Sequence, residues 1–382
     1  MTAVDWQGRL GRVLETARAH AEDVDRRARF PREVVDALGD AGLLGLTVPE
    51  ELGGLGGSFA EAYEVLVRLA ERCASSGMIL TMHYAALAVL REAGGGRFDA
   101  VLREASAGRH LSTLALSEKA TRSSFWISMG EAKRLPDGAT RITVDKSFVT
   151  SAGPATSYVV STGSAERAHL GESDLWLVSA GQQGVEVLDW WQGSGLRGNS
   201  SAPMRFDCEL PPECAVCEPG SGVDVILGTV VPWFQLGACA VSVGVARAAV
   251  EFARAHVTGT VLEHLGQRLV DQPVVRHTLG RLFARVDSVD GFGRATARDL
   301  SDGRATMTQV LELKAVANEA ALEATDGAMR LGGGAAYSGR SGADRLFRDA
   351  RAGVVMAPTA DMLFEMIGRV AAGQPPLDLP HT

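Results

Sequence analysis

The sequence lacks the features that mark several classes of protein. Its 382 residues contain only five cysteines, an odd number at wide spacing, and no apolar leader follows Met1. We therefore expect reduced thiols and a cytoplasmic location rather than a disulfide framework. The net charge is −8 and the basic residues are scattered singly, so we expect neither nucleic acid nor an anionic membrane surface as a partner.

Several catalytic and metal-binding motifs are also missing. Neither a Gly-x-Ser-x-Gly elbow nor a phosphate loop ending in Gly-Lys-Ser/Thr occurs. Cys214 and Cys217, with Cys208 upstream, lack the second pair that a structural zinc site uses, so we expect no metal. The run Gly193–Gly198 matches a dinucleotide fingerprint, but a strand-like stretch follows it instead of a helix. A turn between two strands is the better interpretation.

One uncharged stretch, between Asp224 and Arg247, is long enough to span a membrane. Pro232 lies inside it and removes a backbone donor, which predicts a turn and then a helix from about Trp233. An all-apolar helix in a large protein is usually a core helix, so we expect no membrane span.

The order of the remaining patterns is helix, then strand, then helix, which predicts an α+β protein and not a doubly wound sheet. We expect an N-terminal helical domain at 1–111, a central antiparallel β-barrel or sandwich at 112–218, and a C-terminal four-helix-bundle domain at 219–382. The expected helices cover residues 9–28, 32–41, 59–73, 76–93, 233–257, 273–301, 304–331, 343–354 and 359–371. The expected strands cover residues 141–144, 147–150, 158–162, 175–178, 185–188 and 204–207.

The last third of the chain carries a recognisable pattern. A Leu-Gly-Gly-Gly-Ala-Ala-Tyr run at 331–337 precedes Arg-Asp-Ala at 348–350 and Ala357-Pro-Thr359. This resembles the closing segment of the acyl-CoA dehydrogenase family, in which a Gly-Gly-Asn-Gly turn, an Arg-Asp-Ala helix and a Tyr-Glu-Gly-Thr step follow one another. The glutamate of that step is the usual catalytic base of the family, and Ala357 holds its place here.

Four earlier segments strengthen the resemblance. Phe30-Pro31 and the Val-Pro-Glu-Glu-Leu-Gly-Gly-Leu-Gly run at 48–56 are similar to a helix start and a glycine-rich turn of the family. Leu-Ala-Leu-Ser-Glu at 114–118 resembles the start of the Thr-Glu-Pro-Gly-x-Gly-Ser-Asp signature, although Lys-Ala-Thr-Arg at 119–122 replaces its glycines. Lys-Ser-Phe-Val-Thr-Ser at 146–151 resembles the Lys-x-Trp-Ile-Thr-Asn strand.

The resemblance implies FAD as the cofactor. Leu116 and Ser117 would face the flavin ring, Phe148 would cover it, and the Thr150 hydroxyl would approach its N5 atom. Ser123 would meet the phosphates, and Arg122 would pair with a phosphate where glycines are lost. The full set of residues that we expect to bind the cofactor is Leu116, Ser117, Arg122, Ser123, Phe148, Thr150, Gly332, Gly333 and Thr359.

The missing glutamate leaves the reaction open. The family removes a Cα proton from an acyl thioester, which needs a base. Phe234 fills the place where some relatives carry that base instead. Asp361, four residues after Ala357, is the candidate substitute if helix continues through it, and the alternative is that it only stabilises a helix N-terminus.

Three functions fit this pattern. The first is α,β-dehydrogenation of an acyl thioester, carried by coenzyme A or by an acyl carrier protein, with a relocated base. The second is a monooxygenase that uses reduced flavin and oxygen and needs no Cα base. The third is a flavin- or acyl-binding protein without turnover. The resemblance also implies a homodimer or homotetramer, with an electron-transfer or flavin reductase protein as a further partner.

Overall fold

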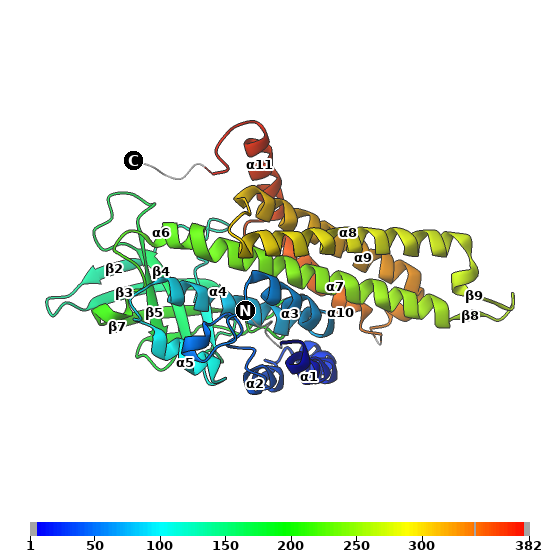
Figure 1. Ribbon diagram of the computed structural model, residues 1–382, viewed down its shortest axis with the longest axis horizontal. Coiled ribbons are helices and arrows are strands. Elements are labelled where there is room, and N and C mark those ends of the chain that lie inside the picture. Colours follow the sequence, from blue (N-terminus) through cyan, green and yellow to red (C-terminus); the bar gives the residue numbers. More distant parts are fainter. Residues whose placement is uncertain (1–5, 340, 378–382) are drawn as a thin grey trace.

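The computed structural model describes residues 6–339 and 341–377. Helices come first, a layer of strands follows, and long helices complete the chain, so the predicted α+β order is confirmed. Figure 1 shows the strands of the two central sheets gathered at one end, while the long helices α7, α8 and α9 extend side by side away from them. Helices α3 and α4 pack against α7 at the junction of the two parts, and α1 packs on α3 in turn.

The first block is helical, as predicted, with one helix more than the sequence indicated. A capping box fixes the start of α3: Ser58 accepts from the helix backbone, and Glu61 accepts from the Ser58 backbone at 2.8 Å. The helix at 99–106 was not predicted, because it is only eight residues long and follows three glycines. The bounds are α1 Trp6–Arg27, α2 Arg32–Asp40, α3 Phe59–Arg72, α4 Ala74–Glu92 and α5 Asp99–Ser106.

The central strands form two sheets, in the orders β1-β4-β5 and β2-β3-β7-β6. Along β3 buried and exposed residues alternate, so one face of its sheet packs on the core. All described pairings within these two sheets are antiparallel except β1 with β4, which run parallel because the long segment 116–156 crosses between them. The bounds are β1 Ser112–Ala115, β2 Glu131–Arg134, β3 Thr140–Val149, β4 Ser157–Gly163, β5 Ser173–Ser179, β6 Val185–Val187 and β7 Ala202–Leu210.

The third block contains helical structure where the sequence analysis expected a turn. The short helix α6 (Gly222–Val225) continues through a π-helical turn at Ile226–Val230 into α7 (Val231–Gly259), which itself starts close to the predicted Trp233. Pro232 sits at the start of α7, and the wider turn before it accommodates the missing N–H. In the described residues, the stretch Gly222–Gly259 alone is long and apolar enough to cross a membrane, and 72% of its apolar window is buried inside the protein.

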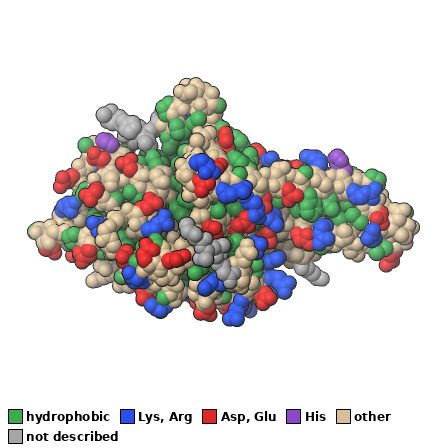
Figure 2. Space-filling view, in the orientation of Figure 1, with side chains coloured by type: hydrophobic (Ala, Val, Ile, Leu, Met, Phe, Trp, Pro, Cys, Tyr) green, Lys and Arg blue, Asp and Glu red, His purple; other side chains and the backbone are tan. Residues whose placement is uncertain are grey.

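The remaining helices pack around α7. A short hairpin, β8 (Val261–Leu262) and β9 (Gln267–Arg268), leads into α8 (Pro273–Ser301). Helix α9 (Met307–Tyr337) is interrupted within the glycine run, as the expected helix end near Leu331 predicts: Gly333, with φ +51° and ψ −138°, leaves the helical conformation, and a short helical stretch follows it. Two shorter helices, α10 (Ala343–Val355) and α11 (Ala360–Ala371), close the fold. On the face shown in Figure 2, acidic and basic side chains are intermixed.

Candidate functional site

The end of β3 brings together several of the residues that the sequence singled out. Phe148 is 65% exposed, whereas Lys146 and Thr150 on either side of it are buried. The Ser147 backbone N–H donates to the Ser117 carbonyl at 2.8 Å, and Lys146 Nζ donates to the Leu116 carbonyl at 3.2 Å. The segment after β1 therefore lies directly beside the end of β3.

A buried ion pair fixes this junction. Lys146 Nζ lies 2.7 Å from Glu118 Oε1 and donates to the Ser161 hydroxyl at 2.9 Å. Glu118 also accepts hydrogen bonds from the Ser128 hydroxyl and from the Met129 backbone N–H, the latter at 2.9 Å. Burial lowers the pKa of Lys146 to about 8, and the Glu118 carboxylate opposes that shift. Glu118 is thus fully engaged and is not a free base.

An aromatic contact supports Phe148 from the side. The Trp191 ring meets it edge to face, with centroids 6.4 Å apart. Trp191 is itself fixed, because its Nε1–H donates to the Leu196 carbonyl at 2.9 Å. The sequence analysis missed Trp191, although the pair of tryptophans at 190–191 was a visible signal. Thr150 shares a hydrogen bond of 3.0 Å with the Ser201 hydroxyl.

The other candidate cofactor residues lie on different elements. Arg122 is exposed and adopts a left-handed backbone with φ +49°, and Ser123 beside it is half-buried. Gly332 and Gly333 lie in α9, with Gly332 buried next to Phe252 and Gly333 exposed at the kink. Thr359 is the N-cap residue of α11.

Residue 357 stands where α9 and α7 meet the segment between α10 and α11. Lys314 of α9 is fully buried and donates to three consecutive carbonyls, those of Met356, Ala357 and Pro358, at 3.0, 3.1 and 3.0 Å. Gln235 of α7 donates from Nε2 to the same Ala357 carbonyl at 3.4 Å. The sequence analysis missed both residues, although Lys314 lies three residues after Leu311 and three before Ala317, in line with apolar positions of α9.

The electrostatics around residue 357 are unusual for a buried cation. Burial lowers the pKa of Lys314 to about 7. Its hydrogen bonds all go to neutral carbonyls, and its ring neighbour is Phe234, 5.7 Å from the ammonium to the centroid. The candidate base Asp361 is exposed in the first turn of α11, and Glu365 further along is exposed too. Helix α11 begins after Thr359, so Ala357 is not on the same helix as Asp361. This arrangement fits the alternative in which Asp361 stabilises the helix N-terminus.

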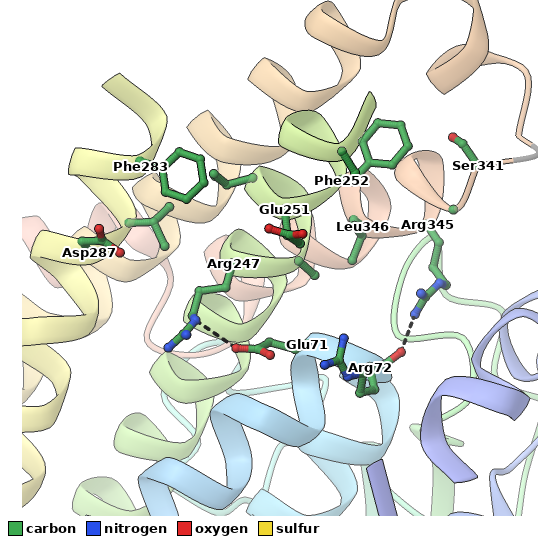
Figure 3. A pocket seen from close by; sticks show the side chains of 15 residues that line it. Glu71, Arg72, Arg247, Glu251, Phe252, Phe283, Asp287, Ser341, Arg345 and Leu346 are labelled. Atoms are coloured by element: carbon green, nitrogen blue, oxygen red, sulfur yellow. Dashed lines mark hydrogen bonds and ion pairs between the residues drawn. The ribbon is translucent and has the colours of Figure 1, made fainter. Parts of the chain in front are cut away.

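A separate pocket of about 470 Å³ opens between the end of α3, the middle of α7, α8 and the start of α10 (Figure 3). Arg247 crosses its floor and pairs with Glu71 at 2.9 Å, while Arg345 donates to the Arg72 carbonyl at 3.3 Å. The residues that line it include none of the cofactor residues expected from the sequence.

Two family models match this chain. Residues 12–95 match the acyl-CoA dehydrogenase N-terminal domain, and residues 220–372 match the acyl-CoA dehydrogenase C-terminal domain. The amino sugar nitrososynthase DnmZ of Streptomyces peucetius is 32% identical over 91% of this chain and 88% of its own length. The chain belongs to the acyl-CoA dehydrogenase family.

Other members of the family show the same relationship at greater distance. The human mitochondrial short-chain specific acyl-CoA dehydrogenase is 25% identical over 92% of this chain and 87% of its own length. The structure of butyryl-CoA dehydrogenase from Megasphaera elsdenii superposes with a TM-score of 0.90 at 20% identity, covering 97% of this chain and 99% of that one. The fold expected from the resemblance is therefore confirmed.

Proposed function

We propose that this protein is a flavin-dependent oxidoreductase with the α,β-dehydrogenation of an acyl thioester as its first candidate reaction. Its membership of the acyl-CoA dehydrogenase family supports this proposal, together with its similarity to a short-chain specific acyl-CoA dehydrogenase. The thioester would be carried by coenzyme A or by an acyl carrier protein. A homodimer or homotetramer, and a redox protein that exchanges electrons with the flavin, belong to the same proposal.

The residues at the end of β3 fit a flavin. An exposed phenylalanine ring on a strand, held from the side by Trp191, offers a flat surface for a planar ring system. The Leu116 and Ser117 backbone lies beside it, and Thr150 adds a hydroxyl. When bound there, FAD supplies the acceptor for a hydride. The protein would supply the ring surface with Phe148 and the hydroxyl with Thr150.

Dehydrogenation also requires an acceptor for the Cα proton, and a side chain in that role contributes roughly 10²–10⁴-fold. Ala357 cannot accept a proton, and Glu118 is committed to Lys146. Asp361 is left as the candidate base. Because it is exposed and sits in a first helical turn, it would have to meet the substrate at the surface end of the site.

A second candidate function is a flavin-dependent oxygenation, which takes electrons through a reductase partner and removes no Cα proton. The observation that favours it is the alanine at 357, next to a buried ammonium group instead of a carboxylate. The 32% identical relative supports it as well, since its name describes the formation of a nitroso group on an amino sugar. A protein that binds flavin without turnover is the third possibility from the sequence.

Anaerobic titration with butyryl-CoA separates these functions. The dehydrogenase proposal expects the substrate alone to bleach the oxidised flavin, and expects Ala357→Glu to accelerate the bleaching at least about tenfold by restoring a base. Ala360→Glu, which adds the same charge three residues away, serves as the matched control. Dehydrogenation would be rejected in favour of oxygenation if butyryl-CoA bleaches the flavin in neither variant and the protein nevertheless turns over with oxygen and a reductase.

A further inference from the structure

Gln235 is a buried amide with one half of its hydrogen-bonding capacity unused. Its side chain is fully buried, and Nε2 donates to the Ala357 carbonyl at 3.4 Å. Oε1 has no hydrogen-bond partner among the described residues. An amide oxygen has two acceptor positions, and leaving it unpaired in the interior costs free energy. Such a group calls for a donor that the protein alone does not provide.

The orientation of this amide follows from its neighbours. Turning it over would point Oε1 at the Ala357 carbonyl oxygen, so two acceptors would face each other. Lys314 cannot serve as the donor in its present position, because its three N–H groups already go to three carbonyls. The oxygen of Gln235 therefore stays free for another partner.

The surroundings restrict what that partner can be. Phe234 packs against Phe125, with ring centroids 6.2 Å apart, and provides apolar surface next to Gln235. The Lys314 ammonium and Gln235 Nε2 contact the same carbonyl oxygen, so a positive charge lies close to the amide. A nearby positive charge disfavours a second cation in such an interior. The partner that fits is an apolar body with one uncharged donor.

We propose that Gln235 is a substrate-binding residue whose Oε1 accepts a hydrogen bond from an uncharged N–H or O–H group of the substrate. The inference rests on the proposed function only in placing the substrate beside residue 357. Lys314 has the second role of excluding ammonium groups, so an amine would bind in its neutral form. An amine or an alcohol can donate such a hydrogen bond to Gln235 Oε1, whereas the C–H groups of a plain acyl chain cannot.

Three small probes of similar shape test this at pH 6 on the flavin-bound protein. Cyclohexanol carries an uncharged donor, methylcyclohexane carries none, and cyclohexylamine is an ammonium ion at this pH. Binding is followed through the flavin absorbance and the unfolding temperature, neither of which requires turnover. We expect cyclohexanol to bind about three- to tenfold more tightly than either of the other two, as a neutral hydrogen bond allows.

Two variants decide the outcome. Gln235→Leu should remove the preference for cyclohexanol, and it should leave the unfolding temperature nearly unchanged, because removing the unpaired oxygen offsets the loss of the long Nε2 bond to the Ala357 carbonyl. Gln235→Glu places a carboxylate at the same point and should reverse the order in favour of cyclohexylamine. Thr113→Val, which removes a buried unpartnered hydroxyl in β1, is the matched control and should preserve the preference of the wild type.

Two results would overturn the proposal. One is an unchanged preference for cyclohexanol in Gln235→Leu. The other is a fall in unfolding temperature for Gln235→Leu that Thr113→Val does not share, because this would show that the Gln235 amide serves the structure, through its Nε2 bond to Ala357 or through an internal water on Oε1. Failure of the proposed reaction with butyryl-CoA would leave both binding comparisons intact, so the two failures are distinguishable.

Discussion

Two buried lysines lie in the two regions described above, one at the end of β3 and one beside residue 357, and their charges are balanced in different ways. Lys146 in the β part faces the Glu118 carboxylate at 2.7 Å, so its charge is neutralised by a partner. Lys314 in the helical part has no carboxylate partner among the described residues: it donates to three neutral carbonyls and lies near the Phe234 ring and the Cys239 thiol. Burial lowers the pKa of both, to about 8 and about 7.

We propose that the region around Lys146 binds the cofactor and that the region around Lys314 binds the substrate. The ion pair of Lys146 locks the segment that carries Leu116 and Ser117 against β3, which is a structural task. Lys314 fixes the segment that contains Ala357, and its ammonium group lies 3.1 Å from the carbonyl oxygen of that residue. We infer that the flavin side of the family site is kept in this chain, while the proton-accepting side has been replaced.

The largest expected effect comes from breaking the ion pair. Glu118→Ala leaves the Lys146 ammonium buried without a counter-charge, which costs about 3–5 kcal/mol of unfolding free energy. Denaturant unfolding measures it. The double variant Glu118→Ala/Lys146→Met should recover most of the loss, and an equally unstable double variant would show that packing, and not charge, sets the cost.

The second comparison is the pH dependence of the two lysines. In the unfolded chain each lysine has its ordinary pKa near 10.5, so between the folded value and 10.5 the unfolded state binds one more proton. Stability therefore rises with pH, from about pH 7 for Lys314 and from about pH 8 for Lys146, by up to roughly 1.4 kcal/mol per pH unit for each group.

Chemical denaturation at a series of pH values between 7 and 9 measures this rise in the free energy of unfolding. The buried His83 and Asp349, with pKa values of about 4 and about 6, complete their titration below pH 7. Cys239 has a pKa raised to about 12, so its contribution to the free energy of unfolding falls only above about pH 9. Lys314→Met should delay the rise until about pH 8. The double variant at positions 118 and 146 should keep the onset at about pH 7, and identical onsets in all three proteins would contradict this assignment.

The smallest expected effect tests the aromatic surface alone. Phe148→Ala should weaken FAD binding by about two- to tenfold, which corresponds to the loss of one aromatic contact. Its ring is 65% exposed, so the unfolding free energy should change by less than about 0.5 kcal/mol. Equilibrium titration with FAD measures the affinity. The exposed Tyr337→Ala serves as a control that should leave FAD affinity unchanged.

The sequence predicted the order of blocks and most helices, because their apolar periodicity is long and regular. It was wrong at 222–230, where α6 and a π-helical turn stand in place of the expected turn, whereas the helix expected over 304–331 does break in the glycine run, at Gly333. From short motifs we predicted that Leu116, Ser117, Phe148 and Thr150 lie close together. The structure does have Leu116 and Ser117 beside the end of β3, which carries Phe148.

No sequence pattern predicts the hydrogen bonds that Gln235 and Lys314 donate to the Ala357 carbonyl. Both depend on α7 and α9 meeting a segment more than 40 residues further along the chain. Such a meeting is a product of tertiary packing and has no local pattern. The role of Asp361 and the division into domains at 111 and 218 stay predictions.

The most direct test of this account is the visible absorbance spectrum of the purified protein after incubation with FAD and removal of the free cofactor. We predict a retained oxidised-flavin band, reduced in Phe148→Ala. A colourless protein that retains no FAD would contradict the central claim that a flavin ring lies against the end of β3.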